Sequence, residues 1–139
     1  MERTIPVCYN GDVTTVDDLR ALEAAFPELS GIMVGRGLIA DPALLRKAVG
    51  GPAASREELR GYHDELYHSL TEAFGMASCA VSRMKAHWHY LIQRFEGSEA
   101  SRSSCAGPGG WEYEVVVNQI FNPAAGGKRL KWSPKPSYP

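Results

Sequence analysis

The sequence predicts an α/β unit followed by an all-α unit, and two observations support this fold class. In residues 1–52, short apolar runs that end in glycine turns alternate with stretches of helical spacing. In residues 53–121, apolar side chains recur every three or four positions, which is typical of packed helices. We therefore expect two strand–helix units, then a helical domain with a flexible loop at residues 97–110, then a flexible tail at residues 122–139.

The first strand–helix unit is expected from a strand at residues 5–9, followed by the turn Asn10, Gly11 and Asp12. Thr15 and Asp18 then have the spacing of a capping box, with Asp in place of the more common Glu. A helix with one apolar stripe should follow, from residue 16 to about residue 26.

The second unit has a buried strand at residues 32–34 and then the turn Gly35, Arg36 and Gly37. Asp41 and Pro42 are a favoured N-cap and first residue for the next helix. Because strand, helix, strand and helix alternate, the two strands should be parallel, and the loops after them should open on the same face. An arginine between glycines can meet phosphate oxygens there, although a plain turn with a solvated arginine has the same pattern.

Two segments closely resemble the last two strand–loop units of bacterial tRNA-dihydrouridine synthases: PVCYNGDV at residues 6–13 and MVGRGLIADP at residues 33–42. Further on, RMKAHWHYL at residues 83–91 and WEYEVVVNQIF at residues 111–121 are similar to helices of that family's C-terminal domain. The resemblance implies the C-terminal portion of a TIM barrel, with two βα units, followed by a helical bundle. A complete barrel takes about 200 residues or more, so we expect the chain of 139 residues to be a fragment.

The resemblance also implies a chemistry. Dihydrouridine synthases use FMN, reduced by NADPH, to reduce a uridine of tRNA, and a cysteine donates the proton. The resemblance implies that the contacts to the flavin phosphate and ribityl chain are made by Asn10, Gly11, Asp12, Gly35 and Arg36. The family's catalytic cysteine lies in the barrel half that precedes this sequence, so no catalytic residue is assigned here.

The three cysteines, Cys8, Cys79 and Cys105, have no metal-ligand spacing and are expected to be reduced thiols. Cys8 lies on the first strand and is expected to be a packed thiol rather than the catalytic acid. With only two strands, the sheet would have unpaired edges, so we also expect self-association.

The helical domain should open with a capping box at Ser55 and Glu58, and its first helix should end at Gly75. The next helix carries an apolar stripe that includes Trp88, which we interpret as core. Arg83 and Lys85 lie off that stripe. They are either a solvated face or, as the resemblance implies, contacts to tRNA phosphates.

The histidines do not have the spacing of a zinc site, so we expect no metal ligands. Residues 97–110 are rich in Gly and Ser where the family usually has basic residues, and Lys128 and Lys131 make the tail basic. The formal net charge is −1, which provides no overall attraction to RNA. There is no apolar run of transmembrane length and no leader pattern, so we expect no membrane association and a cytoplasmic protein.

Three interpretations of the function remain. The chain is part of an FMN-dependent tRNA-dihydrouridine synthase, or a non-catalytic RNA-binding module derived from that family. The third is a fragment of another FMN-binding or phosphate-binding barrel oxidoreductase, since a fold does not determine a function.

Overall fold

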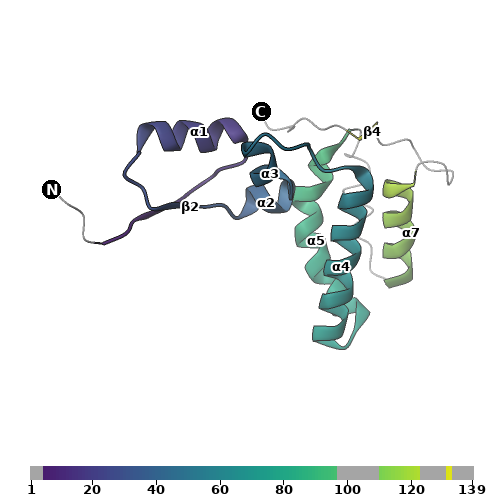
Figure 1. The fold of residues 1–139 in the computed structure, drawn as a ribbon. Helices are drawn as coiled ribbons and strands as arrows, with labels where there is room; N and C mark the ends of the chain where they lie inside the picture. The colour runs from purple at the N-terminus through teal and green to yellow at the C-terminus, as the bar shows by residue number, and fades with distance from the viewer. Residues whose placement is uncertain (1–4, 97–109, 123–130, 133–139) are drawn as a thin grey trace. The chain divides into compact units, whose positions relative to one another are not determined.

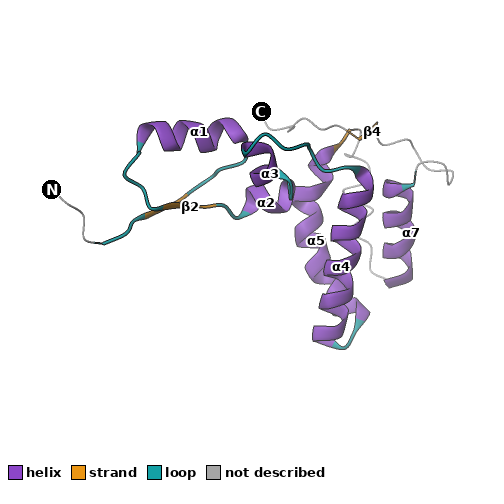
Figure 2. Cartoon of the chain, viewed as in Figure 1, coloured by secondary structure: helices purple, strands orange, loops and turns teal. Residues whose placement is uncertain are grey.

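A computed structural model of the chain describes residues 5–96, 110–122 and 131–132 (Figure 1). The chain divides into two compact units, residues 1–53 and residues 54–139. The first unit contains a small parallel sheet and short helices, and the second is mainly helical (Figure 2). No helix in the described ranges is long and apolar enough to cross a membrane.

The sheet of the first unit consists of β1 (Cys8–Asn10) and β2 (Gly31–Met33). The strands are parallel, with Cys8 opposite Gly31 and Asn10 opposite Met33, which confirms the predicted pairing. The expected strand at residues 5–9 is wrong in its bounds, because the pairing starts only at Cys8 and extends to Asn10. Asn10, the first residue of the predicted turn, therefore belongs to the sheet.

Only one face of this sheet packs on the core of the unit. Tyr9 and Ile32 pack against the buried cluster of Val13, Leu19 and Leu44. Because side chains alternate along a strand, the neighbouring residues Cys8 and Met33 are exposed on the other face. The expectation that Cys8 is a packed thiol is thus wrong for the described structure.

Helix α1 (Val16–Ala25) begins as predicted, with Thr15 as N-cap and a complete capping box. The Asp18 carboxylate accepts hydrogen bonds from the backbone N–H groups of Thr14 at 3.0 Å and Thr15 at 2.8 Å. These bonds, led by the one from Thr14, lower the pKa of Asp18 because they favour the charged carboxylate. The predicted apolar stripe ends before Phe26, whose side chain is 47% exposed.

The helix expected to start at Asp41 and Pro42 has a different arrangement. A short helix α2 (Arg36–Ala40) begins directly after Gly35, and Asp41 is its C-cap. A second short helix, α3 (Leu44–Ala48), follows. Asp41 is buried, accepts a hydrogen bond from the backbone N–H of Ala43 at 3.2 Å, and forms an ion pair with Lys47. The Asp41 carboxylate therefore makes the contact predicted for it at the start of the next helix, although α3 itself begins only at Leu44, and the Asp41 backbone ends α2.

The second unit is built on α4 (Arg56–Phe74), α5 (Ala77–Leu91) and α7 (Gly110–Phe121). Helix α4 begins with the predicted capping box of Ser55 and Glu58, and it ends at Gly75, which has a left-handed φ of 67°. A 3-10 turn η1 (Ile92–Arg94) follows α5. A short antiparallel pair joins β3 (Phe95–Glu96) to β4 (Lys131–Trp132), so two residues of the predicted flexible tail lie in a strand.

The core of the second unit lies where the three helices meet. Trp88 is 2% exposed and central to it, as expected for a packing residue. The other buried apolar side chains come from all three helices and from the segment after α5: Leu59, Ala80, Val81, Met84, Leu91, Ile92, Phe95, Tyr113, Val117, Ile120 and Phe121. The loop expected at residues 97–110 lies almost wholly outside the described residues, and so does most of the tail.

Candidate functional site

An ion pair joins the two loops that follow the parallel strands. The guanidinium of Arg36 donates a hydrogen bond to the carboxylate of Asp12, which lies 24 residues earlier in the sequence. Both side chains remain open to solvent, with 62% of the Arg36 side chain and 72% of the Asp12 side chain exposed. The structure thus brings together one residue from each of the two predicted phosphate-binding turns.

The glycines of these turns have different roles. A Cβ atom at Gly37 would lie 2.1 Å from the carbonyl oxygen of Val13, so glycine is required there for the chain segments to pack. A Cβ at Gly35 would meet no atom within 4 Å, so the space beside its Cα atom is open. At Gly11, a Cβ would lie 2.3 Å from the Tyr9 hydroxyl oxygen, at the far end of a side chain.

The groups at this edge of the sheet suit a ligand with a phosphate and hydroxyl groups. Arg36 offers a planar, charged donor, and the exposed Asn10 amide can both donate and accept hydrogen bonds. The Asp12 carboxylate repels a phosphate but accepts hydrogen bonds from hydroxyl groups. The Arg36 guanidinium can thus donate to phosphate oxygens, and the Asn10 amide and the Asp12 carboxylate can hydrogen-bond to hydroxyl groups.

The two basic residues proposed for RNA lie on α5 but do not form a pair. Arg83 is exposed, and its guanidinium lies over the Phe74 ring at 5.6 Å from the centroid. Lys85 is partly exposed. Residues two positions apart on a helix project in different directions. The side chains of Arg83 and Lys85 therefore do not face each other, and they lie on either side of the buried Met84.

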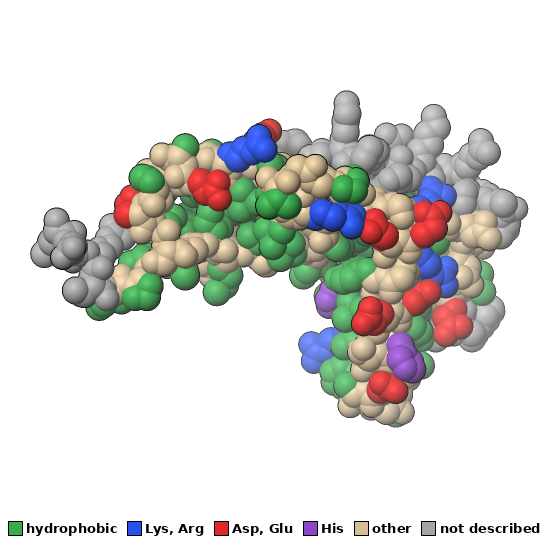
Figure 3. All heavy atoms as spheres, viewed as in Figure 1, with side chains coloured by type: hydrophobic (Ala, Val, Ile, Leu, Met, Phe, Trp, Pro, Cys, Tyr) green, Lys and Arg blue, Asp and Glu red, His purple; other side chains and the backbone are tan. Residues whose placement is uncertain are grey.

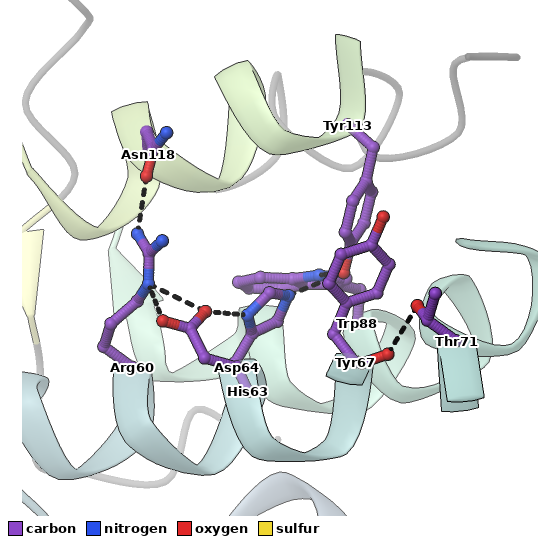
Figure 4. A network of polar contacts seen from close by, with 8 residues as sticks. All are labelled: Arg60, His63, Asp64, Tyr67, Thr71, Trp88, Tyr113 and Asn118. Carbon is purple, nitrogen blue, oxygen red and sulfur yellow. Dashed lines mark hydrogen bonds and ion pairs between the residues drawn. The ribbon is translucent and has the colours of Figure 1, made fainter. Parts of the chain in front are cut away.

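A polar network in the second unit was missed by the sequence analysis (Figure 4). His63 of α4 is 2% exposed, and its Nε2 lies 2.6 Å from the hydroxyl oxygen of Tyr113 on α7. The same hydroxyl accepts a hydrogen bond from Trp88 Nε1 on α5 at 2.9 Å. The sequence signal was present, because His63 follows Leu59 by four residues and so occupies a core position of the helix.

The partners of His63 determine which ring nitrogen carries the proton. Nδ1 lies 2.8 Å from Asp64 Oδ1, and a carboxylate only accepts, so Nδ1 donates. The neutral ring then accepts at Nε2, and the Tyr113 hydroxyl must donate to it. Burial lowers the pKa of His63, although the hydrogen bond and the charge of Asp64 act in the opposite direction.

Arg60 completes the network at the surface. Its Nε donates to both carboxylate oxygens of Asp64, at 2.9 and 2.7 Å, and its Nη1 donates to Asn118 Oδ1 of α7 at 2.8 Å. Burial alone would raise the pKa of Asp64, but the hydrogen bonds from Arg60 and His63 lower it. These contacts connect α4 to α7 by a continuous set of hydrogen bonds.

A small pocket of about 220 Å³ lies beside this network. The residues that line it come from α4 and α7: Arg60, His63, Asp64, Tyr67, Tyr113, Glu114, Val117 and Asn118. In the described part of the chain, no group of three His, Cys, Asp or Glu side chains could hold a metal ion. The polar groups around the pocket bind one another, so the network is best explained as a structural link between helices.

Residues 1–106 match a family model described as dihydrouridine synthase. That range includes both strand-end turns and the helices α4 and α5, whereas α7 lies beyond it. A search of curated proteins found no match.

Proposed function

Because this chain belongs to the dihydrouridine synthase family, we propose that it contributes to the FMN-dependent reduction of uridine to dihydrouridine in tRNA, with NADPH as the reductant. In this proposal, the first unit holds the phosphate end of the flavin, and the second unit faces the tRNA. The isoalloxazine ring of FMN supplies the hydride transfer when it is bound. The residues of this chain bind and orient the groups around it.

The contact between Asp12 and Arg36 is the observation on which this proposal depends. It shows that the turns after β1 and β2 lie at the same edge of a parallel sheet. In α/β barrels, the ligand phosphate is commonly held at the carboxyl ends of the last strands. A guanidinium at that position can donate to phosphate oxygens, and the space beside the Gly35 Cα atom leaves room for a ligand.

We assign a role to each of the five residues. Arg36 and the backbone of Gly35 bind the phosphate, and Gly11 allows the first turn to approach it. Asn10 and Asp12 bind ribityl hydroxyls, and the ion pair holds Arg36 in place. The catalytic cysteine and the residues that enclose the flavin ring belong, in this proposal, to the other strands of a complete barrel.

The substitution Arg36→Ala tests the phosphate assignment. In a form of the protein with a complete barrel, this change should weaken FMN retention by about tenfold or more, because a charge-assisted contact to phosphate is lost. Flavin absorbance after gel filtration and a fluorescence titration measure the effect. Arg20→Ala is the matched control, since Arg20 is also exposed but lies on α1. FMN affinity equal to that of the parent would show that Arg36 does not bind the phosphate.

The 139-residue chain itself should bind FMN weakly and should not reduce uridine, because the two-stranded parallel sheet of the described residues cannot enclose the flavin ring. We also propose that it self-associates, since its two-stranded sheet has open edges and an exposed Met33. Light scattering of the purified chain over a concentration series measures this. A monomer at all concentrations would contradict the proposed self-association.

A further inference from the structure

The turn between α4 and α5 presents two large apolar side chains to solvent. Phe74 is 45% exposed and Met76 is 58% exposed. Gly75 lies between them in a left-handed conformation and ends α4. The space-filling view shows hydrophobic and basic side chains next to each other on this part of the second unit (Figure 3).

The ring of Phe74 is held in place by a basic side chain from the next helix. The guanidinium carbon of Arg83 lies 5.6 Å from the ring centroid, which is a cation–π distance. The acidic side chain of Glu72, on the last turn of α4, lies 3.4 Å from His68 Nε2 in an i, i+4 pair. An aromatic ring and a guanidinium group therefore lie together at the surface of the second unit.

We propose that Phe74 and Arg83 form a stacking platform for an unpaired base of RNA. This proposal depends on the proposed function, in which RNA is the partner of the second unit. Unpaired bases are commonly bound by stacking on aromatic rings or on arginine planes, while positive charges contact the neighbouring phosphates. A ring and a guanidinium in contact combine both properties at one place.

The composition around the platform favours RNA over an apolar protein partner. Among the described residues, Phe74 and Met76 are the large exposed apolar side chains at the turn, and their area is small for a protein docking patch. The positive charge of Arg83 complements a phosphate backbone. Base stacking depends little on sequence, so we expect the platform to add affinity rather than base specificity.

The test compares Phe74→Leu with the parent chain in binding to an unmodified tRNA transcript over a salt series. Leu keeps the apolar contact but removes the aromatic plane, so the affinity should fall by about tenfold. The slope of log affinity against log salt should not change, because no phosphate contact is lost. Phe26→Leu is the matched control, since Phe26 is 47% exposed and lies in the first unit.

The outcomes separate this proposal from the proposed function. If the parent binds tRNA and Phe74→Leu binds equally well, the platform is overturned and the RNA-binding function stands. An equal loss in Phe26→Leu, or a lower salt slope in Phe74→Leu, also overturns it. If the parent does not bind tRNA at any salt concentration, both proposals fail.

A second variant covers the case in which Phe74→Leu does not fold. Phe74→Trp enlarges the aromatic surface, so its affinity for tRNA should equal or exceed that of the parent. Its affinity for a single-stranded oligonucleotide should also exceed that for a duplex of equal length. Weaker tRNA binding by a folded Phe74→Trp chain, or equal binding of single strand and duplex, would contradict the platform.

Discussion

The hydroxyl oxygen of Tyr113 lies 2.6 Å from Nε2 of His63, although the two residues are 50 positions apart in the sequence. It also accepts a hydrogen bond from Trp88 Nε1, so one hydroxyl connects α4, α5 and α7. All three side chains are buried, and their rings lie in one aromatic cluster, with His63 and Tyr113 centroids 5.8 Å apart. The position of α7 on the α4–α5 hairpin therefore depends on a polar contact as well as on apolar packing.

Removing this hydroxyl should destabilise the second unit. In Tyr113→Phe, the Trp88 N–H and the His63 Nε2 lose their partner while they remain buried, which should cost about 2–4 kcal/mol. Urea unfolding followed by tryptophan fluorescence measures the loss. Tyr90→Phe is the control, because Tyr90 is half-buried on α5 and its hydroxyl has no hydrogen bond to another described residue. Similar losses in both variants would contradict the role of the network.

The stability of the protein should fall as the pH is lowered through the histidine range. Burial lowers the pKa of His63 below its ordinary value of about 6.5, so the unfolded chain binds a proton at a higher pH than the folded chain does. The contribution of the neutral His63 to the free energy of unfolding is fully present above pH 6.5. It is lost as the pH falls towards the lower pKa that His63 has in the folded chain. Protonation would also turn Nε2 into a donor, and the Tyr113 hydroxyl would lose its acceptor.

Thermal melting between pH 8 and pH 5 measures this dependence. In the His63→Gln variant, the melting temperature should depend less on pH between pH 6.5 and pH 5, because the contribution of the histidine is removed. His68→Gln should keep the slope of the parent, because the side chain of His68 is 74% exposed. A slope in His63→Gln equal to that of the parent would show that another group is responsible.

The two glycines that flank Arg36 should respond differently to an added methyl group. Gly37→Ala places a Cβ 2.1 Å from the Val13 carbonyl oxygen and should cost about 2 kcal/mol or more. Gly35→Ala meets no atom within 4 Å and should change the stability by much less. In a complete barrel, however, Gly35→Ala should weaken FMN binding, because its methyl group obstructs the phosphate. Melting temperatures and flavin titrations of the two variants separate the roles.

Replacing both basic residues of α5 should weaken tRNA binding in a salt-dependent manner. If Arg83 and Lys85 contact phosphates, the double variant Arg83→Ala and Lys85→Ala should bind tRNA with a shallower dependence on salt. The slope of log affinity against log salt concentration should be lower by up to about 2. The helix content should not change, because both side chains lie outside the buried stripe. Filter binding or fluorescence anisotropy over a salt series measures the slope. A slope equal to that of the parent in a folded double variant would show that the two residues form only a solvated face.

Local signals in the sequence determined most of the secondary structure. The capping boxes at Thr15 and Ser55 and the left-handed Gly75 form where they were predicted, since each depends on residues within four positions. The parallel pairing of β1 and β2 also follows from the alternation of strands and helices. The family itself was recognisable from two glycine turns in the correct order.

Three features were decided only by the tertiary structure, because each depends on distant parts of the chain. A helix begins at Arg36, five residues before the local start signal at Asp41 and Pro42, and its Gly37 packs against the distant Val13 carbonyl. Cys8 is exposed because the helices cover only one face of its sheet. His63 can be buried because the Tyr113 hydroxyl, which also binds Trp88, satisfies one of its ring nitrogens. Whether such a hydrogen bond offsets the cost of burial depends on residues far away in the sequence, so local residue spacing could not predict it.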